Sequence, residues 1–276
     1  MTVPRSGRLP PGAVDPRAAA HDRAHVMEGY LPWAAAFSDA PISRFVVGAV
    51  ALGASGALYA GANLEFPGMP LGASVHAEQF AVANAWLAGE TAIVHLAVTA
   101  MPCGHCRQFL MEAGDPTGLA ISAPGHAAAT LAELLPHAFR PADLRVEARL
   151  LGGARASLGA SAGPTPPAAD ELARAARDAA SRSYAPYSGA LAGAALRLDD
   201  GSVAVGRYAE CAAFNPSLLA VQCALVARAA DARSAVPVAD AVVAEMPAAS
   251  SQRTAAEALL ASLGVPARFV AVVLER

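Results

Sequence analysis

Two short segments of this chain concentrate the residue types that bind transition metals. One contains His76 and Glu78, and the other is the run Pro-Cys-Gly-His-Cys that ends at Cys106. Cys103 and Cys106 lie at the predicted start of a helix, so both sulfurs project from one face of its first turn. A helix N-terminus lowers the pKa of a thiol placed there and stabilises the thiolate that zinc requires. We therefore expect the two cysteines to share a metal ion.

A third ligand comes from His76, which starts the preceding predicted helix. Three protein ligands leave one tetrahedral position for water, which is typical of a catalytic zinc site rather than a closed structural one. His105 falls between the two cysteines on the same turn and is expected to project away from the point where their sulfurs converge. The expected metal is therefore one zinc ion per chain, held by His76, Cys103 and Cys106.

Glu78 is the expected proton carrier of this site. Two thiolates and a neutral imidazole cancel the charge of zinc, so the bound water is acidified less than at an all-imidazole site. The positive ends of the two helices compensate in part. Glu78 stands two residues after His76, where it is not expected to bind the same ion but can lie beside the water and take its proton. We expect a zinc-bound hydroxide as the nucleophile.

The elements that carry these residues alternate between strands and helices. Residues 45–52 and 58–61 predict two strands of a hairpin, with glycines at the turn. Residues 76–88 predict a helix that ends at Gly89, residues 94–100 a buried strand, and residues 103–113 a helix that ends at Gly114. This order predicts an α/β fold with helices packed on a sheet.

The chain also resembles itself. An ungapped shift superposes several residues of the two halves: Ala40, Pro41, Ser43, Gly61 and Glu65 fall on Ala185, Pro186, Ser188, Gly206 and Glu210. The same shift does not preserve the proposed metal ligands and proton carrier. His76, Glu78, Cys103 and Cys106 fall on Val221, Cys223, Ala248 and Ser251. We therefore expect a duplicated fold in which the second copy has lost its ligands.

The composition suggests where the copies begin and end. Residues 152–169 are small and rich in proline, which is typical of a linker. We divide the chain into an N-terminal extension (1–22), a catalytic zinc domain (23–151), this linker (152–169) and a degenerate, non-catalytic domain (170–276). No role is predicted for the extension.

Composition and charge favour a small-molecule enzyme of the cytoplasm. The net charge is −3, all 20 basic residues are arginine, and no basic run is present, which argues against a nucleic-acid partner. No segment has the uninterrupted apolar length of a membrane span, and the N-terminal stretch lacks the apolar region of a signal peptide. Four cysteines in a chain of this length do not make a disulfide scaffold.

The motif formed by these residues resembles the signature of zinc-dependent base deaminases. It consists of a histidine and a glutamate separated by one residue, followed by Pro-Cys-x-x-Cys. Three longer segments are similar to the cytidine deaminases, in their long two-domain dimeric form from enteric bacteria. They are Gly-Ala-Asn-Leu-Glu-Phe ending at Phe66, Val-His-Ala-Glu-Gln ending at Gln79 and Pro-Cys-Gly-His-Cys-Arg-Gln-Phe ending at Phe109. The segment Ala-Ala-Phe-Asn-Pro ending at Pro216 resembles that family's degenerate domain. The resemblance implies a duplicated three-layer α/β/α sandwich with a mixed sheet.

The resemblance also implies the substrate and its contacts. Cytidine and deoxycytidine would be hydrolysed to uridine and deoxyuridine plus ammonia, as in pyrimidine salvage, with Glu78 passing the proton to the ring nitrogen and the leaving ammonia. Asn63 and Glu65 would hold the ribose 3′-hydroxyl, Phe45 would stack on the pyrimidine, and the N–H of Ala77 would bind the base carbonyl. The sequence does not predict a preference between ribose and deoxyribose.

The resemblance further implies a homodimer. In such a dimer Ala213 and Phe214 of the degenerate domain would reach the active site of the partner chain. A fused pair of domains needs only to dimerise in order to bury the surfaces that four single domains bury in a tetramer.

Other interpretations remain open at this point. A nucleotide or nucleic-acid deaminase of cytosine or adenine would need a basic surface, and no Lys or Arg lies between Phe45 and Met101. A zinc-stabilised binding protein without turnover would need the metal ligands but no proton carrier. Without the resemblance, Asn63 and Glu65 would be interpreted as a turn and a solvated carboxylate, and Phe45 as a core residue.

Overall fold

The structure is a computed structural model that describes residues 6–115, 117–153, 158–159 and 170–274. In the first half, a sheet of six strands has the order β1-β3-β2-β4-β5-β6. These strands are β1 (Arg8–Leu9), β2 (Gly48–Gly53), β3 (Leu58–Ala62), β4 (Ile93–Val98), β5 (Ala120–Ser122) and β6 (Ala129–Thr130). β4 and β5 pair in parallel, and the other neighbours pair antiparallel. The sheet is therefore mixed.

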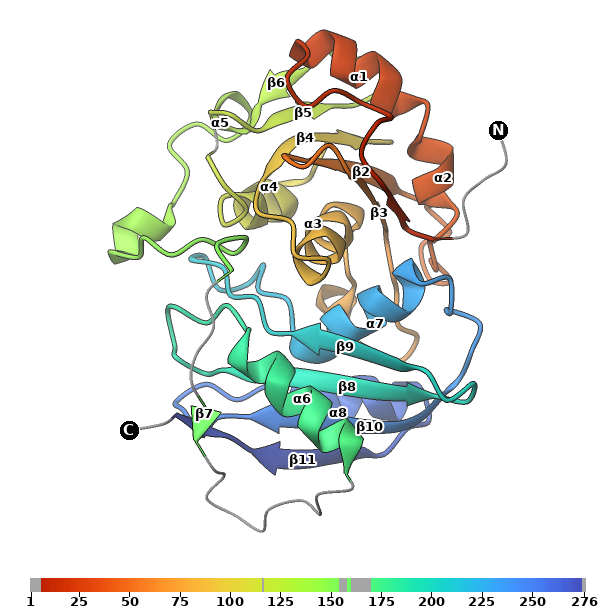
Figure 1. Cartoon of the computed structure of the whole chain (residues 1–276), viewed down its shortest axis with the longest axis vertical. Helices are drawn as coiled ribbons and strands as arrows, with labels where there is room; N and C mark the ends of the chain where they lie inside the picture. The colour runs from red at the N-terminus through yellow and green to blue at the C-terminus, as the bar shows by residue number, and fades with distance from the viewer. Residues whose placement is uncertain (1–5, 116, 154–157, 160–169, 275–276) are drawn as a thin grey trace.

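Helices cover both faces of this first sheet. α1 (Ala20–Glu28) and α2 (Leu31–Ala35) lie on its outer face, and α3 (Ala77–Leu87) and α4 (Gly104–Leu110) lie on its inner face (Figure 1). All six residues of β2 are buried, because successive side chains of a strand point to opposite faces and both faces are covered here. Val50 and Leu52 pack with the residues of α2, whereas Ala49 and Ala51 pack with those of α3.

The second half repeats this plan with a smaller sheet of order β11-β10-β8-β9. Its strands are β8 (Ala192–Leu198), β9 (Val203–Arg207), β10 (Val238–Glu245) and β11 (Ala267–Ala271), of which β10 and β11 are parallel. α6 (Glu171–Ser181) packs on one face. α7 (Ala220–Ala230) and α8 (Arg253–Ser262) pack on the other.

α3 and α7 meet between the two sheets (Figure 1). One apolar core runs through both helices and the inner faces of both sheets. The expected duplicated three-layer α/β/α sandwich is confirmed, with the inner helices of the two copies packed on each other. The two helices that carry the chemical residues, α3 and α4, are both inner helices of the first copy.

One glycine in each sheet brings the inner helix unusually close. A Cβ atom at Gly61 of β3 would collide with the backbone oxygen of Ala77, and one at Gly206 of β9 would collide with that of Ala220. Glycine alone permits such an approach of two backbones. The first residue of α3 and the first residue of α7 are therefore fixed against their sheets in the same way.

The structure corrects the register of the repeat at the helices. The sheets keep the ungapped shift, since Ala49 lies opposite Val98 as Ala194 lies opposite Val243. The helices do not keep it: α3 and α7 begin after His76 and Leu219, and α4 and α8 begin after Cys103 and Gln252. The expected equivalences of His76 with Val221 and of Cys103 with Ala248 are therefore wrong, because the loops before these helices differ in length between the copies.

The predicted elements of the first half are present with shifted ends. The first strand of the hairpin starts at Gly48 rather than at Phe45, which lies in an exposed loop. α4 ends at Leu110 rather than at residue 113, since the N–H of Ala113 bonds to the oxygen of Leu110 in a tighter turn. Sequence reasoning missed α1 and α2, which precede the first predicted strand.

Several short elements complete the chain. They are η1 (Leu71–Ala73), α5 (Leu131–Leu134), η2 (Pro141–Leu144), β7 (Leu158–Gly159) and β12 (Val273–Leu274), of which β7 pairs with β12. Most of the predicted linker, residues 154–157 and 160–169, lies outside the described residues.

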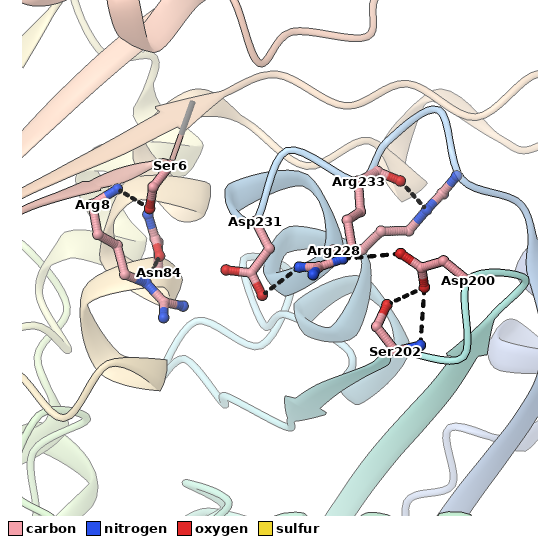
Figure 2. Close-up of polar contacts among 8 residues, drawn as sticks. All are labelled: Ser6, Arg8, Asn84, Asp200, Ser202, Arg228, Asp231 and Arg233. Carbon is pink, nitrogen blue, oxygen red and sulfur yellow. Dashed lines mark hydrogen bonds and ion pairs between the residues drawn. The ribbon is translucent and has the colours of Figure 1, made fainter. Parts of the chain in front are cut away.

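The N-terminal segment joins the first half to the second. β1 pairs with β3, and the N–H of Gly7 donates to the oxygen of Ala230 at 2.7 Å. Figure 2 shows Arg8 beside Asn84 of α3, with the Nε of Arg8 donating to Oδ1 of Asn84 at 2.7 Å. The Nδ2 of Asn84 donates to the oxygens of Gly7 and Ala60. Part of the predicted extension is therefore integrated into the first sheet.

Replacing Asn84 with alanine is expected to destabilise the protein. Asn84 is fully buried, so its loss leaves the oxygen of Ala60 without this donor, at a cost of about 1–3 kcal/mol for a group that water cannot reach. The half-buried Arg8 also loses its bond, whereas the oxygen of Gly7 still accepts from the N–H of Ala60 at 2.8 Å. The free energy of unfolding from urea denaturation measures the effect. Asp231→Asn is the control, because its ion pair with Arg233 at 3.7 Å is exposed (Figure 2) and is worth at most about 1 kcal/mol. Equal losses in the two variants would contradict the assignment.

Candidate active site

The predicted metal ligands converge at the N-termini of α3 and α4. His76 and Cys103 are the residues immediately before these helices, both with extended backbones. The Nδ1 of His76 lies 3.5 Å from the Sγ of Cys103 and 3.3 Å from that of Cys106, and the two sulfurs are 3.7 Å apart. Among the described residues, these three form the one group of histidine, cysteine and acidic side chains placed to hold a metal ion.

These distances fit zinc. A tetrahedral ion with Zn–S bonds of about 2.3 Å and a Zn–N bond of about 2.0–2.1 Å would separate the two sulfurs by about 3.8 Å and the nitrogen from each sulfur by about 3.5 Å. One imidazole and two thiols form a donor set that zinc prefers, with room for a fourth ligand. The residues therefore suit a zinc ion at this place.

The two thiols shift each other's pKa in opposite directions. The hydrogen bond with Cys106 lowers the pKa of the Cys103 thiol to about 4. The same hydrogen bond and burial raise the pKa of the Cys106 thiol far above its usual range. Because zinc binds thiolates, both cysteines are expected to be deprotonated when they hold the ion.

Glu78 lies beside this group without belonging to it. The residue is 4% exposed. Burial raises the pKa of its carboxyl, against the opposing effects of its own backbone N–H and of Cys106. A carboxyl that is buried next to the metal ligands but is not one of them is suited to carry a proton.

His105 lies outside the metal-binding group, in agreement with its place between the cysteines. Its ring does not simply point away, however, because it stacks on the ring of His76 with 5.2 Å between centroids and 28° between planes. Burial lowers the pKa of His105. The stacked ring of His105 supports the orientation of His76.

A cavity of about 320 Å³ opens onto the metal-binding group. It is lined by predicted site residues from four separate segments: Phe45, Asn63, Glu65, His76, Ala77, Glu78 and Cys103. Cys106 is buried behind them. Sequence reasoning missed other residues of the wall: Ser43, Val47, Leu71, Ser74, Val75, Ala100 and Met101. Two of these residues could have been found from the repeat, because Ser43 recurs as Ser188 and Met101 recurs as Met246.

Glu65 stabilises the turn before the cavity. Its Oε2 accepts from the backbone N–H groups of Ile42 and Ser43 at 2.8 and 2.9 Å, and its Oε1 accepts from the hydroxyl of Ser43. Burial acts to raise the pKa of Glu65, but these hydrogen bonds outweigh it and lower the pKa below the usual range. Glu210 makes the same three bonds with Tyr187 and Ser188. The repeated glutamate therefore has a structural role in both halves.

Asn63 fixes the loop that carries Phe45. Its Oδ1 accepts from Ser38 and from the N–H of Val47, and its Nδ2 donates to the oxygen of Phe45 at 2.8 Å. The side chain of Phe45 is 62% exposed at the rim of the cavity. Asn63 therefore stabilises a turn, as we expected of it without the resemblance. One N–H of its amide is left for a ligand.

The duplicated fold, with one His-Cys-Cys group among the described residues and a buried carboxyl beside it, defines a zinc-dependent deaminase domain. In the part of the second copy that the structure describes, no such group is present. Comparison with protein families agrees. Residues 24–120 and residues 131–257 each match a family described as the zinc-binding region of cytidine and deoxycytidylate deaminases. The family match and the donor set together identify zinc as the metal.

Individual relatives extend over most of the chain. A cytidine deaminase of Sodalis glossinidius is 48% identical over 242 residues, which cover 85% of this chain and 78% of that protein. A cytidine deaminase of Actinobacillus succinogenes is 46% identical over 243 residues, covering 88% of this chain and 80% of that protein. The chain belongs to the cytidine deaminase family.

Among solved structures, that of a cytidine deaminase from Mycobacterium tuberculosis is similar to part of the chain. It covers 41% of this chain and 93% of its own, with 36% identity and a TM-score of 0.38.

Proposed function

We propose that this protein hydrolyses the amino group of cytidine and deoxycytidine, releasing uridine or deoxyuridine and ammonia. The observation that carries this proposal is that His76, Cys103 and the buried Glu78 line one cavity, with Cys106 buried against the other two donors. When bound, zinc acts as a Lewis acid that lowers the pKa of water. The side chains and backbone of the cavity transfer the protons and orient the substrate.

Glu78 is the proton carrier of the proposal. Its carboxyl accepts a proton as the oxygen of water attacks C4 of the base, and delivers it to N3 of the ring. It then helps to move the second proton of the water to the amino group as the C4–N bond breaks. Water and cytidine thus give uridine and ammonia with no other reactant, and the burial of Glu78 keeps its proton from exchanging freely with solvent.

The other wall residues orient the nucleoside in this proposal. The backbone N–H of Ala77 binds the base carbonyl, Phe45 stacks on the ring, and Asn63 and Glu65 hold the 3′-hydroxyl. Asn63 has a free N–H, and Glu65 has further lone pairs, so each can bind a hydroxyl without giving up its present partners. Contact through the 3′ oxygen admits both sugars.

An uncharged nucleoside is favoured over a nucleotide by the same cavity. The residues described as lining it include no arginine that would neutralise a phosphate. Ammonia release from cytidine, compared with CMP and with a cytosine oligonucleotide, tests the choice. Turnover of cytidine alone is expected. Preference for CMP or the oligonucleotide would favour the nucleotide or nucleic-acid alternative, and no turnover with a full complement of zinc would favour a binding protein.

We further propose a homodimer in which Ala213 and Phe214 close the partner's active site. Phe214 is 65% exposed, and Phe45 and Leu71 at the rim of the cavity are 62% and 73% exposed. An interface of this kind would cover these exposed apolar side chains. In the described residues no helix has the length and apolar character to cross a membrane. A cytoplasmic place of action and a part in pyrimidine salvage remain part of the proposal.

Mixing two impaired variants is expected to test this closure. Phe214→Ala removes the closing ring and should lower kcat/KM for cytidine at least about tenfold, as the loss of a buried aromatic contact does at interfaces. Glu78→Gln removes the proton carrier but keeps Phe214. If closure is across chains, subunit exchange pairs an intact Glu78 with an intact Phe214, and activity returns. Exchange without recovery, or an active monomer in sedimentation, would contradict it.

A further inference from the structure

The first turns of α3 and α7 are joined by two equivalent hydrogen bonds across the boundary between the halves. The Nε2 of Gln79 donates to the backbone oxygen of Pro216 at 2.9 Å. The Nε2 of Gln222 donates to the backbone oxygen of Ala73 at 2.7 Å. Each glutamine is the third residue of its helix, and each acceptor lies shortly before the other helix begins. The two halves therefore hold each other by a reciprocal pair of contacts.

Each glutamine also binds the residue at which its own helix begins. The Oε1 of Gln79 accepts from the backbone N–H of His76 at 3.2 Å. The Oε1 of Gln222 accepts from the backbone N–H of Leu219 at 2.8 Å. The residue held in this way is a proposed zinc ligand in the first half and a leucine in the second. The two halves therefore contain the same set of glutamine contacts, and only in the first half does the contacted residue serve as a proposed metal ligand.

An amide side chain satisfies both contacts at once. The partner at the helix start is a donor and the partner in the other half is an acceptor, and the amide offers one group of each kind in a rigid plane. Gln79 and Gln222 are 2% and 5% exposed. Because water has little access to either amide, a lost partner is not replaced. Fixing Nε2 of Gln79 on Pro216 therefore also orients its Oε1 toward His76.

We propose that Gln79 is a positioning residue for His76, and that the second half of the same chain sets the place of this ligand through the oxygen of Pro216. Gln79 does not line the catalytic cavity, so it acts through His76 rather than on the substrate. The proposal deepens the zinc-dependent function proposed above and rests on it. Residues that hold a metal ligand typically change metal affinity or activity by about 10- to 100-fold when replaced.

Gln79→Met in the full-length protein is the first test. Methionine keeps the length and removes both hydrogen bonds. Competition with a chromophoric chelator is expected to show zinc held about 10- to 100-fold more weakly than in the unaltered protein. For the zinc-loaded variant, kcat should fall while KM for cytidine changes less than about threefold, because the sugar and base contacts are not touched.

Gln222→Met is the matched control, because it removes the same two kinds of bond from the equivalent place. It should lower the urea midpoint about as much as Gln79→Met does, yet keep zinc affinity and kcat within about twofold of the unaltered protein, since Leu219 binds no metal. Equal losses of zinc affinity in the two variants would show a merely structural role and overturn the proposal. Unchanged zinc affinity in Gln79→Met would also overturn it.

Gln79→Glu separates the two ends of the side chain. Ionised glutamate keeps an acceptor for the N–H of His76 but has no donor for Pro216, whereas protonated glutamate still has one. Zinc affinity is therefore measured across pH, and weaker binding that appears as the carboxyl ionises is expected if the second half sets the position. Zinc affinity equal to that of the unaltered protein at every pH would overturn the role of the second half. This variant also provides the test if Gln79→Met does not fold. The zinc measurement needs no turnover, so inactivity of the unaltered protein toward cytidine would refute the proposed function while leaving this comparison intact.

Discussion

Glu78→Gln is expected to retain zinc and to lose nearly all turnover of cytidine. Glutamine fills the same buried space and leaves the three donors of His76, Cys103 and Cys106 unchanged. It cannot accept a proton from water or pass one to the base. Each general acid or base step is worth about 100- to 10,000-fold in rate, and one carboxyl serves several steps here. The expected loss in kcat is therefore at the upper end of this range or beyond it.

The measurement is kcat for ammonia release from protein of known zinc content. A variant that keeps more than about a tenth of the original kcat would refute the proton-carrying role. Glu90→Gln is the matched control. Glu90 is another buried carboxylate, 6% exposed, that accepts hydrogen bonds from Ser55 and Tyr59 away from the cavity. It is expected to lose stability but to keep kcat.

The metal-binding group was predictable from sequence because helix geometry fixes the spacing of its members. Cys103 and Cys106 lie one helical turn apart at a helix start, and such a spacing brings two sulfurs together in whatever fold surrounds them. His76 required one further step, since its helix had to lie beside the first. The glycine of β3 at position 61 helps to fix this arrangement through its contact with Ala77, and its matching position in the repeat was already visible in the sequence.

What the sequence did not predict depends on how distant segments meet. Gln79 belongs to a recognisable segment, but its partner Pro216 lies in the other half and becomes visible only when α3 and α7 are placed together. The helix starts of the second copy were misplaced because an ungapped shift cannot account for loops of different length. Phe45 was placed in a strand because its apolar run continues into β2, whereas the bonds of Asn63 hold it in a loop outside the sheet.

Cys106→Ala is expected to remove both the zinc and the activity. Cys106 is completely buried, and its sulfur lies close to both other donors. Without it, two protein ligands remain, which is fewer than zinc sites in proteins provide. Elemental analysis should give one zinc per chain for the unaltered protein and less than about a tenth of that for the variant. Two zinc ions per chain in the unaltered protein would mean that the second half also binds metal.

Cys211→Ala and Cys223→Ala are the controls for this loss. Both thiols are buried, and burial raises the pKa of each to about 12. They therefore remain protonated, whereas zinc binds the thiolate form of cysteine. Neither belongs to the metal-binding group of the described residues. Each variant should keep one zinc per chain, although each loses some packing in the core.

The same variants test whether zinc contributes to folding as well as to catalysis. Zinc that binds only the folded chain stabilises it, so a chelator should lower the Tm of the unaltered protein and of both control variants. Cys106→Ala should already melt at the lower temperature, and the chelator should not lower its Tm further. A chelator effect of equal size in Cys106→Ala would place the stabilising metal somewhere other than His76, Cys103 and Cys106, and the assignment of the site would then be wrong.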